Sequence, residues 1–153
     1  MSLFHWSFPY QYQSYFLVGI QLLCLVLILF TGPVVAESWI WGGLELFGIA
    51  LGMWALGSMS LHTMNIFPDV RAGSILVTHG PYHYIRHPMY TAVLLISFAL
   101  ILSEWSWPRV CLGIILVGDL IVKLRYEERL LAKHFKSYQA YQHRTACLFP
   151  YLF

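Results

Sequence analysis

The sequence predicts an all-α integral membrane protein with four transmembrane helices and a cytoplasmic helical extension at the C-terminal end. Of its 153 residues, 59% are hydrophobic and only 10% are charged, whereas a soluble domain of this size carries about 25% charged residues. The charges are concentrated in the last third of the chain, and long stretches before it carry almost none. This distribution is typical of a membrane protein with polar ends.

Four hydrophobic runs define the predicted transmembrane helices, and together they form one transmembrane domain over residues 1–153. The runs cover approximately residues 15–30, 40–59, 88–103 and 109–123. The last two are shorter than the ~20 residues that cross a ~30 Å hydrocarbon core. The fourth is expected to continue into water as a helix, because Lys123 to Phe135 contains no Gly or Pro to end it. The first run lacks the flanking features of a cleaved signal peptide, so we expect it to be retained.

The distribution of Lys and Arg predicts the orientation in the membrane. With four spans, the connection at 60–87 and the C-terminal segment lie on one side, together with every Lys and Arg except Arg109. The positive-inside rule makes this side the cytoplasm and places both the N- and C-termini there. Trp residues at 39–41 and 105–107 suit the opposite membrane interface.

Net charge and cysteine content indicate which partners and linkages are not expected. The formal net charge is only +2, which gives no reason to expect nucleic acid as a partner. Cys24, Cys111 and Cys147 are far apart in the sequence and form no CxxC pair. We interpret them as small, buried hydrophobic residues.

Three histidines at a spacing of four residues raise the question of a metal site. Gly80-Pro81 interrupts any helix that would align His79, His83 and His87 on one face. The same stretch contains no Cys or acidic residue that would complete a ligand set. No metal site is therefore predicted.

The connection before the third span is rich in polar residues and in residues with special backbone preferences. Gly80-Pro81 indicates a turn. Pro88 suits the first turn of the third helix, where its missing N–H leaves no hydrogen bond unmade. His87 then lies at the start of that helix, where free backbone N–H groups favour an anion such as a carboxylate. The segment is a candidate functional site on these grounds.

Acidic residues inside the hydrophobic runs are the second signal. Asp119, Lys123 and Glu127 are spaced i, i+4, i+8 and therefore share one face of a helix. An ionisable group inside a span is unfavourable and usually paired, so Lys123 is the expected partner of Asp119. This face could also be a simple ladder of ion pairs that ends the span. Glu45, in the second span, could hydrogen-bond to the bundle or line a pocket.

Three segments together resemble the membrane methyltransferases of the isoprenylcysteine carboxyl methyltransferase and phospholipid methyltransferase superfamily. They are LVTHGPYHYIRHPMY at 76–90, the acidic pair Glu127-Glu128, and FKSYQAY at 135–141. Their order and spacing match across roughly the last 90 residues. The first two spans match only as generic membrane helices.

The resemblance implies a helical fold without a Rossmann domain, and a pocket for S-adenosyl-L-methionine at the cytoplasmic membrane face. The pocket would be formed by the connection, the start of the third span and the C-terminal segment. The residues that would bind the cofactor, carried over by motif, are Ser74, Ile75, Leu76, Val77, Tyr82, His87, Pro88, Met89, Tyr90 and Glu127.

Three residues are predicted to act on the reaction itself. By the resemblance, Arg86 would face the reacting end of the cofactor. Carboxyl-methylating members carry an Arg where this chain has Lys123, and a Lys cannot form the bidentate contact with a carboxylate that an Arg forms. An amine acceptor would have to lose a proton, and His87 is one of the groups that could assist.

The predicted function is S-adenosylmethionine-dependent methyl transfer to a lipophilic or membrane-embedded substrate. An isoprenylcysteine-like carboxylate and a lipid head group both remain open as the methyl acceptor. One alternative is a non-enzymatic membrane scaffold or binding protein. A membrane reductase similar to the sterol reductases, which are much longer and use a nicotinamide cofactor, is a further alternative.

Overall fold

The computed structural model describes residues 10–59 and 76–150, which are helical for most of their length. The elements are α1 (Tyr10–Phe30), α2 (Trp39–Ser58), the 3-10 helix η1 (Gly80–His83), α3 (Pro88–Ser103), α4 (Trp107–His134) and α5 (Tyr138–Gln142). Among these residues the only β-type pairing is an isolated parallel bridge between Ile85 and Ala146. The predicted all-α class is confirmed for the part of the chain that the structure describes.

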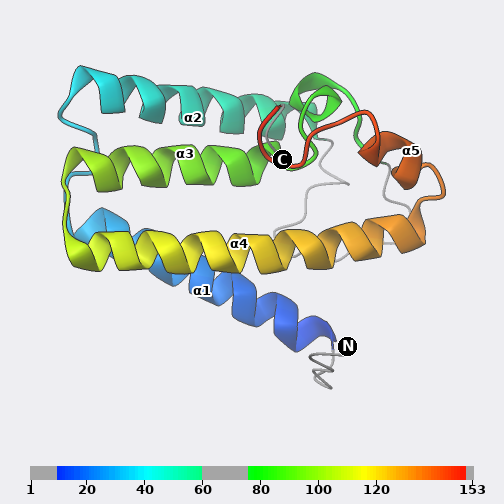
Figure 1. The fold of residues 1–153 in the computed structure, drawn as a ribbon, viewed down its shortest axis with the longest axis horizontal. Helices are drawn as coiled ribbons and strands as arrows, with labels where there is room; N and C mark the ends of the chain where they lie inside the picture. Colours follow the sequence, from blue (N-terminus) through cyan, green and yellow to red (C-terminus); the bar gives the residue numbers. More distant parts are fainter. Residues whose placement is uncertain (1–9, 60–75, 151–153) are drawn as a thin grey trace.

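The four long helices form two closely packed pairs. α2 lies along α3, and α1 crosses α4 (Figure 1). α3 also contacts α4, so that the two pairs form one bundle. η1 and α5 lie at one end of this bundle, and the short connections from α1 to α2 and from α3 to α4 lie at the other (Figure 1).

Two of the four predicted spans are borne out by length and composition. α1 and α2 are each long and apolar enough to cross a membrane. α3 is apolar but has only 16 residues. α4 carries Arg109, Asp119 and Lys123 in its otherwise apolar first part and continues without a break to His134. The membrane crossing of α3 and α4 therefore stays a prediction.

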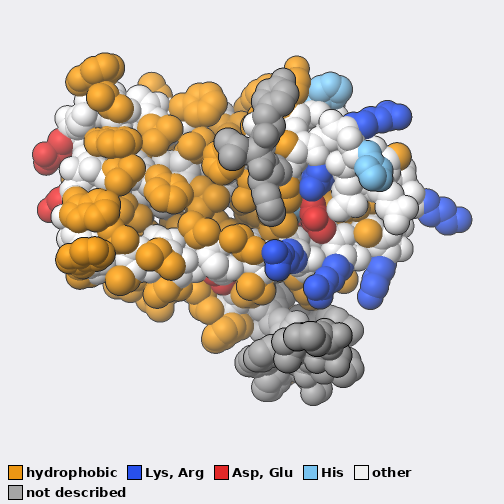
Figure 2. Space-filling model, in the orientation of Figure 1, with side chains coloured by type: hydrophobic (Ala, Val, Ile, Leu, Met, Phe, Trp, Pro, Cys, Tyr) orange, Lys and Arg blue, Asp and Glu red, His pale blue; other side chains and the backbone are white. Residues whose placement is uncertain are grey.

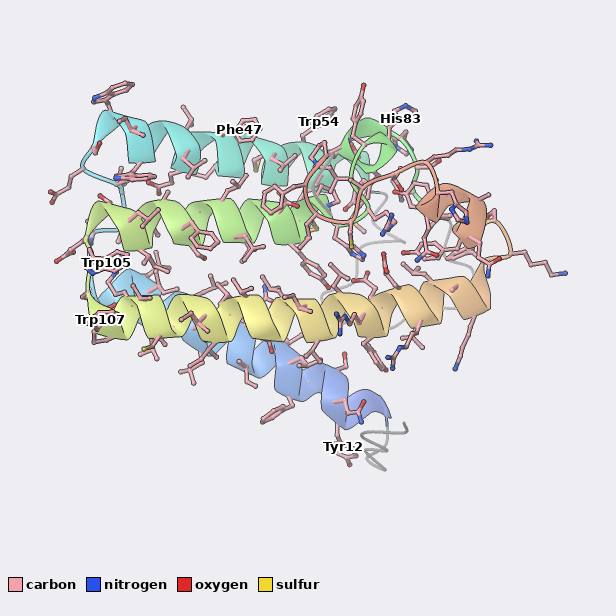
Figure 3. All side chains as sticks on the ribbon, in the orientation of Figure 1. Tyr12, Phe47, Trp54, His83, Trp105 and Trp107 are labelled. Carbon is pink, nitrogen blue, oxygen red and sulfur yellow. The ribbon has the colours of Figure 1, made fainter. Side chains whose placement is uncertain are left out.

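The surface supports a membrane environment. Hydrophobic side chains cover most of the face over the long helices, whereas Lys, Arg and His side chains gather at the end that carries η1 and α5 (Figure 2). Phe47 and Trp54 point outward from α2, and Trp105 and Trp107 lie at the end opposite His83 (Figure 3). Such extensive apolar exposure would be an aggregation hazard in water and is the expected surface in lipid.

Close approach of α2 and α3 depends on a small residue. A Cβ atom on Gly48 would lie 2.9 Å from Ile96 Cγ1 and 3.2 Å from the carbonyl oxygen of Ala92. Only a residue without a side chain lets the two backbones pack at this distance, which is how helices commonly associate in membranes. The α2–α3 pair thus holds the start of α3 in a fixed position.

Two buried ionisable residues hold the end of the bundle away from η1. Arg109 is 1% exposed and donates from Nη2 to the carbonyl oxygen of Leu100 at 2.7 Å. Its Nη1 lies 3.5 Å from Glu104 Oε2. Glu45 accepts a hydrogen bond from the backbone N–H of Ala36 at 2.9 Å. Of the two roles considered for Glu45 from the sequence, this contact agrees with hydrogen bonding to the bundle. Arg109 is the one cation that the sequence placed on the opposite side from the others. In the structure it caps the C-terminal end of α3 from inside the bundle.

Substitution of Gly32 is expected to disturb this cap. A Cβ at Gly32 would overlap Arg109 Nη1 and lie 2.7 Å from Glu104 Oε2. We predict that Gly32→Ala destabilises the protein by about 1–3 kcal/mol, the usual range for overpacking. Thermal unfolding of purified protein in detergent measures this effect.

Gly43→Ala is the matched control. Gly43 lies in α2 with open space around its Cα, so an added methyl group meets nothing within 4 Å. Replacing a helical Gly with Ala should raise stability by about 0.5–1 kcal/mol. Equal melting temperatures for the two variants would contradict the proposed packing of Arg109 against Gly32.

Candidate active site

The C-terminal segment lies beside the segment that leads into α3. The chain turns at Gly80, whose φ of 61° is a backbone conformation that side chains disfavour. Beyond η1, the backbone N–H groups of Arg86 and His87 donate to the carbonyl oxygens of Ala146 (2.9 Å) and Cys147 (3.1 Å). Thr91 Oγ1 adds a hydrogen bond to the carbonyl oxygen of Leu148 at 2.7 Å. The first turn of α3 is thereby fixed against the C-terminal segment.

Arg86 joins this arrangement to α4. Its Nε donates to Glu128 Oε1 at 2.7 Å. Its Nη1 donates to the carbonyl oxygens of Gln142 (3.1 Å) and Thr145. A guanidinium group can make several such bonds in fixed directions at once, which a Lys ammonium cannot. Arg86 therefore holds three parts of the chain together.

Glu128 is the anion at the centre of these contacts. His87 Nε2 lies 3.5 Å from the same Oε1 that accepts from Arg86. Burial raises the pKa of Glu128, but hydrogen bonds and charges from His87 and Arg86 outweigh burial and lower it from 4.5 to about 2. The sequence pattern emphasised Glu127 of the acidic pair, and the structural part of Glu128 was missed. The RHP motif and the adjacent acid were the only signals that could have indicated it.

Glu127, His87 and Tyr90 form the more open part of the site. Tyr90 Oη donates to Glu127 Oε2 at 2.8 Å. His87 Nδ1 lies 3.6 Å from the same oxygen, and the His87 and Tyr90 rings are stacked with an interplanar angle of 3°. The Glu127 side chain is 29% exposed, whereas that of His87 is 5% exposed. The geometry thus presents an oriented, partly exposed carboxylate at the edges of two stacked rings.

Lys123 lies one helical turn deeper in the bundle. Its Nζ donates to Gln21 Oε1 on α1 at 2.7 Å and lies 5.3 Å from the centroid of the Tyr90 ring. The expected hydrogen-bonded pair with Asp119 is not formed, because Lys123 turns toward Gln21 and the Tyr90 ring instead. Neither carboxylate oxygen of Asp119 has a hydrogen-bond partner within the described residues.

The remaining predicted cofactor residues that the structure describes lie between residue 76 and the first turn of α3. Leu76 and Val77 lead into η1 and are half-buried, and Tyr82 within η1 is buried. The carbonyl oxygen of Tyr82 accepts a hydrogen bond from Tyr141 Oη at 2.6 Å. Pro88 is buried in the first turn of α3, where Met89 is half-buried. Ser74 and Ile75 lie outside the described residues.

One group of side chains has atoms close enough together to hold a metal ion. The ligand atoms of His87, Glu128 and Cys147 all lie within 4.8 Å of one another. Arg86 Nε is already 2.7 Å from Glu128 Oε1, and this cation opposes a second positive charge at the same oxygen. We therefore assign no metal to the group.

Comparison with known families identifies the protein class. A family model described as phospholipid methyltransferase matches residues 34–138. The chain belongs to this family, which confirms the resemblance inferred from 76–90, 127–128 and 135–141. The match also includes α2, whose sequence by itself resembled only a generic membrane helix. No curated protein shows significant similarity to the chain.

The structure predicts a strong effect of Glu128→Gln on stability. The variant would leave Arg86 without its charged acceptor, and a hydrogen bond to a charged group contributes about 1.5–3 kcal/mol. We expect a loss of this size in the free energy of unfolding. Glu127→Gln, which removes the charge from a carboxylate that Arg86 does not contact, is the matched control and should lose less.

Acidification should remove the same contribution from the wild type. Because the folded-state pKa of Glu128 lies below its ordinary 4.5, its stabilisation is fully present above pH 4.5 and is lost as the pH falls toward 2. The difference in melting temperature between wild type and Glu128→Gln should shrink over this range. A constant difference would show that Glu128 is not the group responsible.

Proposed function

We propose that the protein transfers a methyl group from S-adenosyl-L-methionine to a lipophilic or membrane-embedded acceptor at the cytoplasmic membrane face. The main support for this proposal is the position of the Glu127 carboxylate. It is partly exposed, oriented by Tyr90 and placed beside buried His87. Membership of the phospholipid methyltransferase family supports methyl transfer as the reaction class.

The residues present fit the proposed cofactor. An accessible carboxylate can accept hydrogen bonds from the hydroxyl and amino groups of a nucleoside. The stacked His87 and Tyr90 rings lie next to it. His87 is held between Glu127 Oε2, at 3.6 Å from its Nδ1, and Glu128 Oε1, at 3.5 Å from its Nε2, which fixes the ring beside the open carboxylate. We assign cofactor binding to Ser74, Ile75, Leu76, Val77, Tyr82, His87, Pro88, Met89, Tyr90 and Glu127.

The chemistry makes modest demands on the protein. When bound, S-adenosylmethionine supplies an electrophilic methyl group that passes to the acceptor as its carbon–sulfur bond breaks. The chain must align the acceptor and exclude water, which are the main contributions of positioning to catalysis. The junction of α3, α4 and the C-terminal segment lies where an apolar surface meets a charged end, so a lipid and a water-soluble cofactor can both reach it (Figure 2).

Lys123 and Arg86 take different parts in this proposal. Lys123 is 4% exposed and acts as a buried point charge beside the Tyr90 ring. We assign it the electrostatic orientation of the acceptor. Arg86 uses Nε and Nη1 for protein groups, which supports a positioning role through Glu128 and the C-terminal segment. We assign to His87 the acceptance of a proton from a methyl acceptor that must lose one.

The orientation of the protein belongs to the same proposal. Exposed cations on and after the last part of α4 include Arg125, Arg129, Lys133 and Lys136. α1 begins at the end of the bundle that carries α5 (Figure 1). With α3 and α4 as the third and fourth spans, the positive-inside rule places this end, and both termini, in the cytoplasm.

Cofactor binding tests the proposed function directly. Glu127→Gln should weaken the binding of S-adenosylmethionine by about ten- to a hundredfold, because a charge-assisted hydrogen bond is worth about 1.5–3 kcal/mol. Calorimetric titration of purified protein measures the affinity. Glu104→Gln, an exposed acid at the opposite end of the bundle, is the control and should bind as the wild type does. A non-enzymatic scaffold would give no cofactor binding in any variant.

Labelling with a membrane-impermeant maleimide tests the orientation. Cys111 is exposed and must first be replaced by Ser, whereas Cys24 and Cys147 are buried and can remain. In sealed right-side-out vesicles, Ser106→Cys should label and Lys136→Cys should label only after permeabilisation. Labelling of both positions from the same side would refute the proposed topology.

A further inference from the structure

Asp119 is a buried carboxylate without a hydrogen-bond partner among the described residues, in the seam between α1 and α4. It is 7% exposed, and among the described residues no group donates a hydrogen bond to either of its oxygens. Leu116 and Leu120, its neighbours on α4, are 0% and 1% exposed. The carboxylate therefore lies in an apolar region of the bundle, where an unpaired polar group is strongly unfavourable.

The nearest polar groups donate no hydrogen bond to Asp119, although the charge of Lys123 attracts it. Lys123, one turn along α4, directs its Nζ to Gln21 Oε1 and the Tyr90 ring. Cys24, buried on α1 at the same seam, has a thiol that is at best a weak donor. A lone acid kept at the expense of stability is typical of a binding site.

We propose that Asp119 binds the polar end of the methyl acceptor, and that this end donates hydrogen bonds, as an amine or a hydroxyl does. An ionised carboxylate can accept hydrogen bonds at both oxygens but donates none. An acceptor with a carboxylate at this position would be repelled by Asp119. The assignment of this ligand as the methyl acceptor rests on the proposed function.

The position of Asp119 agrees with that role. Asp119, Lys123 and Glu127 follow one another at intervals of four residues on α4, so they share one helix face within about 12 Å. The proposed acceptor contact and the proposed cofactor contact therefore belong to the same face. Lys123 lies between them, where its ammonium group can hold an oxygen of the acceptor.

The α1 side of the seam is rich in exposed apolar side chains. α1 packs mainly on α4, and outside this contact most of its large hydrophobic side chains are exposed. α1 crosses α4 at an angle and diverges from it toward its N-terminal end (Figure 1). Asp119 therefore lies in a seam whose α1 side presents an apolar surface to its surroundings.

Binding of single-chain probes with the same tail tests the proposal without cofactor or turnover. The probes are decylamine, decanol and decanoate, each titrated into purified protein in the same detergent, with affinity measured by calorimetry. We expect decylamine or decanol to bind at least about tenfold more tightly than decanoate, a difference worth roughly one good hydrogen bond. The tighter of the two identifies an amine or a hydroxyl as the donor. Equal or tighter binding of decanoate overturns the proposal.

Asp119→Leu is the decisive variant, and Glu37→Leu, which removes an exposed acid at the other end, is its matched control. Asp119→Leu should lose the preference for donor-bearing probes and should keep or raise the melting temperature, because it removes an unpaired buried charge. Glu37→Leu should keep the preference. Retention of the preference in folded Asp119→Leu overturns the proposal.

A substitute variant and a measurement of cofactor binding complete the test. If Asp119→Leu does not fold, the isosteric Asp119→Asn replaces it, and an unchanged preference in that variant counts against an ionised carboxylate as the ligand. If the preference is found but no variant binds S-adenosylmethionine, Asp119 is a lipid-binding residue and the methyl-transfer function fails separately.

Discussion

The hydrogen bonds of Arg86 to Glu128 and to the carbonyl oxygens of Gln142 and Thr145 determine how the rest of the site is arranged. Glu128 belongs to α4, and the two carbonyls belong to the segment after it, so one side chain fixes the first turn of α3 against both. His87 follows Arg86 directly and is thereby placed against Glu127 and Tyr90. The partly exposed carboxylate of Glu127 is therefore held in place through Glu128, whose Oε1 contacts Arg86 and His87.

The charged side chains at the two ends of the bundle have different partners. At one end, Arg109 and Glu45 bind backbone groups and hold the connections between helices. At the other end, charged side chains bind one another and leave part of their capacity free. Asp119 lies between these regions and has the partners of neither. Among the described residues, this contrast makes Asp119 the buried acid whose surroundings do not explain its presence.

Much of the fold follows from the sequence because it depends on local pattern. Long apolar runs, Pro88 at a helix start and the uninterrupted stretch after Lys123 indicate where the helices lie. The clustering of His87, Tyr90 and Glu127 was indicated by the family motif. The bridge between Ile85 and Ala146, and the turn of Lys123 toward Gln21, depend on how distant segments pack. No local pattern encodes contacts between distant segments. The contacts that Glu128 makes with Arg86 and Gln21 makes with Lys123 were therefore not predicted.

The contact between residues 84–87 and 145–148 has a consequence for biosynthesis. The carbonyl groups that receive Arg86, and those that pair with the backbone before α3, leave the ribosome after all four long helices have been made. The RHP segment therefore lacks these neighbours while the long helices are being made. Synthesis of the helices and completion of the site are separate events, and the nascent chain cannot position Glu127 for a ligand until residues 142–148 have emerged.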